Sequence, residues 1–315
     1  MDEYPGRVRA SSDGALLSYN IRVPRVRRAR GVTVFINGLS NACFQLEPLA
    51  DDAAARGRVV ITYDMRGHGC SEDPKNYDTV NAAAFASDAW TVVDAARRSR
   101  PDLASEDERS VAVIGYSYGA RVGLEMIRLR PECVTCFVSI LGSPDRILSG
   151  LMPHAAARLA TRATRLAGVR ATTAMVGAML RFASTMPMLS HVIGHLTGYL
   201  KSSYGDFARP FFKALNRLDA ETWVRCVWDA TESGAKDVLA TLRPRGVYVG
   251  IIAGDKDFAA PLREMRAWSE YASFYVMLPN VAHDGLRSNT QRVVELVREI
   301  LVSAETSADD AKRKK

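Results

Sequence analysis

Val111-Ala-Val-Ile-Gly-Tyr-Ser-Tyr-Gly-Ala120 joins a short apolar run to an abrupt Gly-x-Ser-x-Gly turn. The apolar residues indicate a buried strand, and a helical pattern begins at Ala120. Gly115 and Gly119 flank a turn that is too tight to admit side chains at these two positions. The pentapeptide alone is a weak signal in a chain with 22 glycines. Together with the strand before it and the helix after it, it predicts a nucleophile elbow that exposes the Ser117 hydroxyl.

The same alternation of strand and helix runs through most of the chain. Short apolar runs predict strands at residues 31–36, 59–63, 136–141, 247–253 and 273–278. Helical spacing occurs at residues 43–56, 83–97, 120–130 and 290–303, another helix starts at Pro261, and residues 7–22 indicate a leading hairpin. This pattern predicts an α/β fold in which helices cover both faces of a mostly parallel sheet.

The alternation stops between residues 145 and 239, where no convincing strand occurs and Ala, Leu and Met are abundant. We interpret residues 145–240 as an inserted helical cap. It would separate two parts of one α/β core, residues 1–144 and residues 241–305. Residues 306–315 form a polar tail that we expect to be unstructured.

The predicted cap supplies candidates for substrate binding. Five of the ten methionines lie within it. Flexible thioethers suit a lining for a variable apolar ligand, although core packing explains them equally well. We assign Met175 and Met179 to substrate binding. The uncharged run at residues 182–200 is long enough to suggest a membrane span, but Pro187 and two histidines interrupt it, so we expect no stable membrane insertion.

Composition fits a globular protein of a reducing compartment. Of the 315 residues, 47% are apolar and 24% are charged, which is ordinary for such a protein. The acidic first residues lack the apolar segment of a secretory signal. Five scattered cysteines, an odd number, do not suggest a disulfide framework. We therefore expect a cytoplasmic location.

The net charge of +7 and the pI near 9.2 raise the question of nucleic acid binding. Basic side chains cluster at residues 22–30, 158–165 and 312–315. Solvated faces explain each cluster better than a nucleic-acid surface does. Arg158, Arg162 and Arg165 would share one helical face. A second interpretation of this face is a landing site for an anionic or carrier-bound substrate.

Two motifs suggest a metal or redox site only weakly. Cys133 and Cys136 form a Cys-x-x-Cys motif, but neither a second pair nor an adjacent histidine completes a zinc site. His191 and His195 are four residues apart, but the residues between them lack the glutamate of a zinc hydrolase helix. The sequence therefore predicts no metal and no organic cofactor.

A serine hydroxyl is a poor nucleophile, so Ser117 needs a general base, and that base needs an acid to fix its tautomer. Asp257 follows a strong apolar strand, and His283 follows the next strand. Both positions would fall at the carboxyl edge of the sheet that displays Ser117. Asp255 is a competing candidate for the acid. The 140 residues between Ser117 and Asp257 (257 minus 117) leave room for the cap.

These motifs resemble the α/β-hydrolase superfamily, in particular its capped esterases, C–C hydrolases and haloperoxidase-like members. The resemblance covers roughly residues 7–305 and implies the order Ser, Asp, His. It rests on four motifs: Gly115-Tyr-Ser-Tyr-Gly119, Asp64-x-Arg66-Gly67-x-Gly69-x-Ser71, Gly254-x-x-Asp257 and the late His283.

The resemblance also implies an oxyanion hole made of two backbone amides, those of Leu39 and Tyr118. Family members commonly carry His-Gly where this chain has Asn37-Gly38. We expect the oxyanion hole to survive this change, with different hydrogen bonding beside it, and we assign Asn37 to the substrate-binding region. We interpret His68 as structural.

The sequence thus predicts a serine hydrolase that cleaves a carboxylic ester or thioester of a lipophilic acyl group through an acyl-enzyme. A serine at position 117 argues against dehalogenase and epoxide hydrolase chemistry, in which a carboxylate attacks carbon. C–C bond hydrolysis, lactone opening and acyl transfer use the same triad and stay open, as does a small-ligand receptor on the same scaffold. The expected partner is a small molecule and not nucleic acid, and the sequence specifies no oligomeric state.

Overall fold

The computed structural model describes residues 1–25, 29–40, 42–99, 111–142, 154–196, 200–201, 211–212, 214–260 and 262–313. Its centre is an eight-stranded sheet with the order β1-β2-β4-β3-β5-β6-β7-β8. The strands are β1 (Asp2–Arg9), β2 (Leu16–Val23), β3 (Val32–Ile36), β4 (Val59–Tyr63), β5 (Val111–Tyr116), β6 (Val134–Ile140), β7 (Tyr248–Gly254) and β8 (Phe274–Leu278). The predicted hairpin and strands are confirmed.

The central strands are parallel, whereas β1 and β2 form an antiparallel edge. Every residue of β3, β4 and β5 is buried. These strands have apolar side chains on both faces, because helices cover both sides of the sheet. In the register of β3 with β5, Val34 lies opposite Val113. Strand β5, which leads to Ser117, therefore lies in the interior of the sheet.

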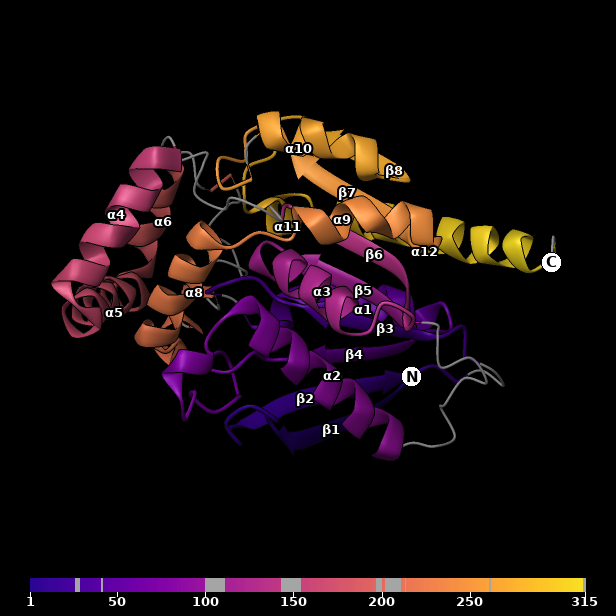
Figure 1. Ribbon diagram of the computed structural model, residues 1–315, viewed down its shortest axis with the longest axis horizontal. Helices are drawn as coiled ribbons and strands as arrows, with labels where there is room; N and C mark the ends of the chain where they lie inside the picture. Colours follow the sequence, from indigo (N-terminus) through magenta and orange to yellow (C-terminus); the bar gives the residue numbers. More distant parts are fainter. Residues whose placement is uncertain are drawn as a thin grey trace.

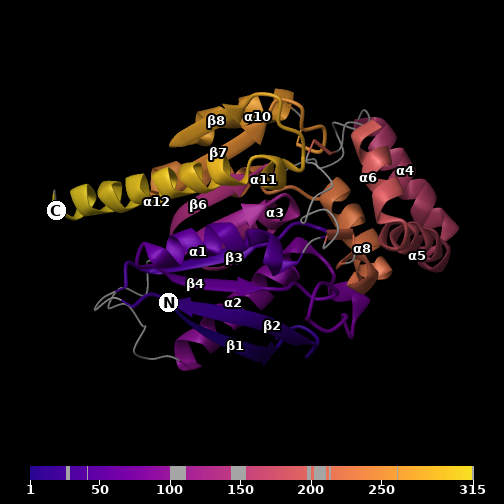
Figure 2. The same cartoon turned by 180° about the vertical axis from the view of Figure 1, so that it is seen from behind.

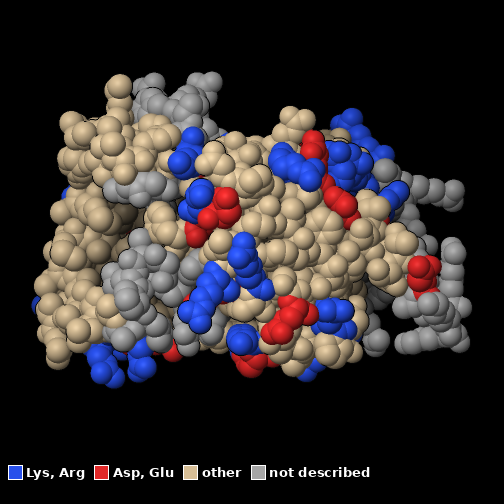
Figure 3. Space-filling view, turned by 90° about the horizontal axis from the view of Figure 1, so that it is seen from above, with Lys and Arg blue, Asp and Glu red and all other residues tan. Residues whose placement is uncertain are grey.

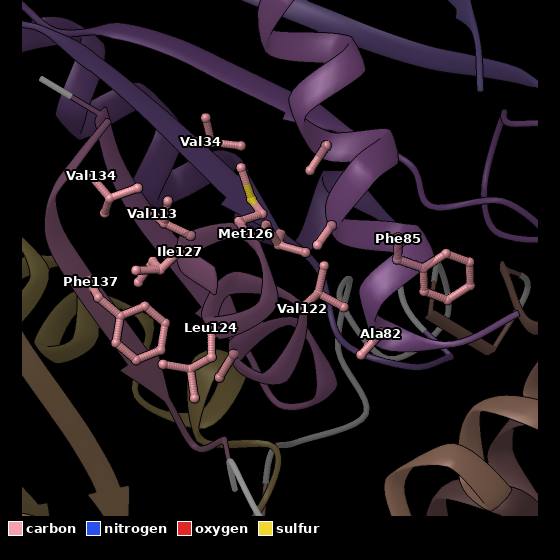
Figure 4. Packing of buried hydrophobic residues seen from close by; sticks show 14 of the residues in the cluster. Val34, Ala82, Phe85, Val113, Val122, Leu124, Met126, Ile127, Val134 and Phe137 are labelled. Atoms are coloured by element: carbon pink, nitrogen blue, oxygen red, sulfur yellow. The ribbon is translucent and has the colours of Figure 1, made fainter. Parts of the chain in front are cut away.

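Helices flank the sheet on both sides (Figures 1 and 2). One face is covered by α2 (Ala82–Ser99), α3 (Tyr118–Leu129), α9 (Lys236–Leu242) and α10 (Leu262–Trp268), and the other by α1 (Glu47–Ala55) and α12 (Thr290–Arg313). Figure 4 shows Val122, Met126 and Ile127 of α3 packed near Val34 and Val113 of the sheet. The short helices are η1 (Cys43–Leu46), η2 (Tyr77–Thr79), η5 (Arg243–Arg245), η6 (Ser269–Tyr271) and α11 (Gly285–Ser288).

Between β6 and β7 the described chain is helical. Before α9 and η5, which complete this segment, its elements are α4 (His154–Ala167), α5 (Val169–Thr185), α6 (Pro187–Leu196), η4 (Leu215–Arg217) and α8 (Ala220–Glu232). Helices α4, α5 and α6, which we call the outer helices, lie beyond α8 at the end of the molecule opposite the C-terminus (Figures 1 and 2). Val176 and Leu180 of α5 belong to a small separate apolar cluster with Val224 of α8.

The prediction of an unstructured tail is wrong for residues 306–313, because α12 continues to Arg313. Alanine, lysine and arginine favour helix in this stretch. Glu305 also fixes the helix to the core, since its carboxylate accepts hydrogen bonds from Arg30 (3.3 Å) and Arg58 (2.7 Å). Among the described residues, none of the helices has the length and apolarity needed to cross a bilayer.

Candidate active site

Ser117 occupies the sharp turn between β5 and α3. Its backbone has φ 54° and ψ −122°, a conformation that costs a non-glycine residue about 1–3 kcal/mol. A Cβ on Gly115 would collide with the backbone of Ala120, and a Cβ on Gly119 would collide with the Ile36 carbonyl at the end of β3. Glycine at both positions therefore lets strand, turn and helix pack closely, with Ser117 at the carboxyl edge of the sheet.

The structure brings Ser117, His283 and Asp257 together. Ser117 Oγ lies 2.9 Å from His283 Nε2. On the other side of the imidazole, Nδ1 lies 3.0 Å from Asp257 Oδ2 and 3.1 Å from Oδ1. All three residues are buried, with 8%, 7% and 3% of their surface exposed for Ser117, His283 and Asp257. This chain of contacts allows a proton to pass from the hydroxyl to an imidazole that a carboxylate orients.

The two candidate acids differ in what they contact. Asp257 Oδ1 accepts hydrogen bonds from the amides of Ala259 (2.9 Å) and Ala260 (3.0 Å), which hold the carboxylate toward the imidazole. Asp255 Oδ1 instead accepts from the amide of Val281 at 3.3 Å. Asp255 thus fastens the loop that leads to His283, and the geometry favours Asp257 as the partner of the histidine.

Tyr116 is a site residue that the sequence analysis missed. Its hydroxyl donates to the backbone carbonyl of His283 at 2.7 Å. Its ring stacks on the imidazole, with centroids 5.9 Å apart and planes 23° apart. The only sequence signal is an aromatic residue directly before the elbow serine. Tyr116 therefore positions both the backbone and the ring of His283.

Tyr118 directly follows Ser117, and the loop that carries Leu39 approaches the serine through Gly38. Tyr118 is the first residue of α3, where backbone amides have no acceptor within the helix. Its side chain points elsewhere, because its hydroxyl donates to Asp229 at 3.0 Å and burial raises the pKa of Tyr118 well above its usual value. Leu39 follows Gly38, and a Cβ on Gly38 would lie 2.9 Å from Ser117 Cβ. The loop after β3 therefore runs directly against the serine.

Two contacts from outside this loop hold it in place. Ser40, whose φ is 67°, accepts a hydrogen bond from Trp223 Nε1 of α8 at 2.8 Å. The buried carboxylate of Asp64 accepts from the amides of Cys43 (2.8 Å) and Cys70 (2.9 Å). Asp64 thereby joins the loop after β3 to the loop after β4, and Trp223 joins it to the helical insertion.

Buried ion pairs of Arg66 hold the Arg-Gly-His-Gly loop after β4. Arg66 is fully buried and donates to Asp88 (2.6 Å) and Asp13 (2.7 Å). Burial raises the pKa of Asp88 to about 7, while Arg66 opposes this shift. His68 Nδ1 lies 3.0 Å from the carbonyl of Arg66, and burial lowers the pKa of His68. These contacts agree with a structural role for His68.

The predicted substrate-binding residues have less support. Asn37 is 1% exposed, and its side-chain amide donates to the neighbouring Gly38 carbonyl at 3.3 Å. Met175 and Met179 are 63% and 52% exposed on α5, whereas Val176 and other residues of this helix are buried. The geometry supports a place for Asn37 in the loop beside Ser117, but it does not support a pocket lined by the two methionines.

The weak metal and redox candidates are the pair His191 and His195 and the pair Cys133 and Cys136. The rings of His191 and His195 pack with centroids 4.6 Å apart. In the described part of the chain, no group of three or more potential ligands surrounds them or any other point. Cys133 and Cys136 are both free thiols, and burial raises the pKa of Cys136 to about 12.

A buried Ser, His and Asp at the carboxyl edge of a mostly parallel sheet, with the serine on a strand-to-helix elbow, are features of the α/β-hydrolase fold. The model of the alpha/beta hydrolase family matches residues 33–296, and the chain belongs to this family. It is therefore a hydrolase of the α/β fold. A comparison with curated protein sequences finds no match to the chain.

Solved structures share this fold at low sequence identity. An esterase from Exiguobacterium antarcticum matches with a TM-score of 0.69 and 15% identity, over 94% of this chain and 99% of that chain. An enol-lactonase from Burkholderia xenovorans LB400 matches with 0.65 and 16%, over 94% and 100%. An epoxide hydrolase from Vigna radiata matches with 0.65 and 16%, over 96% and 98%. At these identities the likeness shows the fold alone.

Proposed function

We propose that this protein is a serine hydrolase that cleaves a carboxylic ester or thioester of a lipophilic acyl group through an acyl-enzyme. The observation that carries the proposal is the contact of 2.9 Å between Ser117 Oγ and His283 Nε2, continued by Asp257 at 3.0 Å. A serine with an oriented base at this distance is the arrangement that nucleophilic catalysis requires.

In the proposed mechanism, Ser117 Oγ attacks the substrate carbonyl carbon while its proton passes to His283 Nε2. Asp257 holds the other ring nitrogen and stabilises the imidazolium. The amides of Leu39 and Tyr118 donate to the oxyanion of the tetrahedral intermediate. Its collapse breaks the bond to the leaving alcohol or thiol, which takes the proton from His283. Water then repeats the sequence on the acyl-enzyme and releases the acid.

The contacts around the triad support this assignment. Tyr116 holds the backbone of His283 through its hydroxyl, and Trp223 and Asp64 hold the loop that carries Leu39. Fixed donors and a fixed base reduce the reorganisation that the reaction needs. Apart from the substrate and water, every group in this mechanism belongs to the chain.

Lactone opening is a second candidate, and an enol-lactonase from Burkholderia xenovorans LB400 is among the solved structures that share this fold. A lactone differs from an open ester only in that the leaving alcohol stays attached to the acyl group. The same triad and oxyanion donors therefore serve both reactions. Competition between lactones and open-chain esters in one assay separates the two substrate classes.

The test is multiple-turnover hydrolysis of p-nitrophenyl esters of increasing acyl length, with a thioester and a lactone alongside. We expect Ser117→Ala to lose about 1,000-fold or more in kcat. Ser269→Ala, which alters an exposed serine in η6, is the matched control and should keep wild-type rates. Hydrolysis by Ser117→Ala at the wild-type rate would exclude the mechanism. Ligand binding without turnover would instead indicate a receptor.

The cysteines support a cytoplasmic location as part of the proposal. All five are free, and Cys136 and Cys226 are buried. Free thiols persist in a reducing compartment, whereas exposed thiols such as that of Cys70 oxidise outside it.

A further inference from the structure

The positive charge of the protein is concentrated in one stretch of the sequence. The whole chain has 42 Lys and Arg against 35 Asp and Glu. Residues 146–205 contain no Asp or Glu and seven basic residues: Arg146, Arg158, Arg162, Arg165, Arg170, Arg181 and Lys201. The rest of the chain therefore has 35 basic residues (42 minus 7) against 35 acidic residues. The entire net charge of +7 lies in the stretch that contains the outer helices.

The outer helices also expose most of the large apolar side chains on the surface. Of the fifteen large hydrophobic residues that are exposed in the described part of the chain, ten lie on α4, α5 and α6, and Met186 lies between α5 and α6. On α6 they form one side of the helix, with exposures between 43% and 83%: Met188, Leu189, Val192, Ile193 and Leu196. His191 and Gly194 are buried on the other side. Helix α6 therefore presents its apolar side outward.

A second apolar stripe runs along α5. Met175, Met179 and Phe182 are spaced at i, i+4 and i+7, which places them on one side of the helix, and Met186 follows at its C-terminal cap. All four are at least 45% exposed. We call this stripe and the outward side of α6 the outer apolar surface. Exposed apolar patches on this scale mark sites where a protein meets an apolar partner.

Helix α4 adds basic residues to this end of the molecule. Arg158, Arg162 and Arg165 are exposed, beside the exposed Leu159 and Leu166. Arg165 pairs with Glu232 of α8 at 2.8 Å. Within the described residues, neither Arg158 nor Arg162 has an acidic partner. Figure 3 shows the end formed by the outer helices as mainly uncharged surface with basic side chains at its margin.

We propose that the outer helices dock onto the surface of an anionic lipid bilayer. Helices that lie in a membrane interface bury an apolar side among the lipid headgroups and keep basic residues near anionic lipids. The outer apolar surface supplies the first feature. The exposed Arg158 and Arg162, in a stretch that has no Asp or Glu from residue 146 to residue 205, supply the second. Docking in the plane of the interface needs no helix that crosses the bilayer.

Charge distinguishes this occupant from a second copy of the chain. A symmetric dimer through the outer apolar surface would bring the basic stretches of both copies to one interface. Like charges repel, and their desolvation would add to the cost. A bilayer with anionic lipids offers the opposite charge together with an apolar interior.

The test is co-flotation of the full-length protein with phosphatidylcholine vesicles, with and without phosphatidylglycerol, at low and high salt. We expect the protein to float with phosphatidylglycerol vesicles at low salt, and to bind weakly at high salt or to phosphatidylcholine alone. Ser117→Ala should bind like the wild type, so a failure of the proposed hydrolysis would leave this test intact.

Two sets of variants test the two features separately. The triple variant Met188→Ser, Val192→Ser and Leu196→Ser should weaken partitioning by more than about tenfold, because it removes apolar contacts with lipid. The double variant Arg158→Gln and Arg162→Gln should weaken it by about thirtyfold, given about 1 kcal/mol for each basic residue. Circular dichroism checks that each variant folds.

The matched controls alter exposed residues elsewhere. Leu129→Ser with Val302→Ser changes exposed apolar residues, and Arg245→Gln with Arg263→Gln changes exposed arginines. Both controls should partition like the wild type. Failure of the wild type to float with anionic vesicles would overturn the proposal. A wild-type dimer that becomes monomeric in the triple variant would also overturn it, because the partner would then be a second copy of the chain. Binding to polyglutamate without binding to vesicles would overturn it as well, because the partner would then be an acidic protein.

Discussion

Tyr116→Phe tests whether the catalytic histidine is held by the residue before the elbow serine. The substitution keeps the ring that stacks on His283 and removes the hydroxyl that donates to the His283 carbonyl at 2.7 Å. Tyr116 is 3% exposed, so water does not readily replace the lost donor. A buried acceptor left without its hydrogen bond costs about 1–3 kcal/mol. We expect the free energy of unfolding to fall by that amount.

The same substitution should lower kcat more than it changes KM. Tyr116 acts on the base and has no role in the proposed substrate contacts. A loss of about 1.4 kcal/mol in transition-state stabilisation corresponds to a tenfold fall in kcat. The assay is p-nitrophenyl ester hydrolysis, combined with urea unfolding of the same protein preparations.

Tyr275→Phe is the matched control on β8. The Tyr275 hydroxyl is buried and has no hydrogen-bond partner among the described residues. Removing it should leave kcat unchanged and the free energy of unfolding unchanged or slightly higher. If Tyr116→Phe behaved like Tyr275→Phe in both measurements, the positioning role assigned to Tyr116 would be refuted.

In ester hydrolysis assays, Asp257→Asn should lower kcat by about 10,000-fold, whereas Asp255→Asn should lower it less than about tenfold. The reason is that the carboxylate of Asp257 contacts the imidazole of His283, whereas that of Asp255 accepts from the Val281 amide. Trp223→Phe removes the donor to Ser40, so kcat should fall several-fold while KM stays unchanged. A rise in KM with kcat unchanged would instead indicate that Trp223 binds the substrate directly. Burial raises the pKa of Asp88 to about 7 in the folded protein, so the folded state keeps this proton while the unfolded state loses it above about pH 4. Urea titrations should therefore show the unfolding free energy of the wild type falling from about pH 4 to about pH 7 relative to Asp88→Asn, and parallel curves would contradict the raised pKa.

The fold could be predicted because its signals are local. Strands β3 and β5 are buried on both faces, so each appears in the sequence as a continuous apolar run. The positions of Ser117, Asp257 and His283 at strand ends then followed from the parallel order of the strands. The sequence analysis placed these three residues at one edge, and the structure brings them within hydrogen-bond distance.

Contacts between distant residues could not be predicted. Tyr116 contacts a carbonyl 167 positions further along the chain, and nothing in the pentapeptide specifies that partner. A helical stripe shows that one side of a helix is apolar but not what that side faces. Met175 and Met179 were for this reason assigned to a pocket, whereas both are largely exposed. Likewise, the basic clusters were interpreted one by one, although the absence of acidic residues between Asp145 and Asp206 is the stronger signal.

The most direct test of the central claim is to trap the acyl-enzyme. The protein is mixed with a p-nitrophenyl ester, quenched in acid during the first turnover, and digested for mass spectrometry. The account predicts one acyl group on the peptide that contains Ser117, which disappears on longer incubation and does not form in His283→Ala. An acyl group on a different residue, or steady hydrolysis with no acyl group on Ser117, would contradict it.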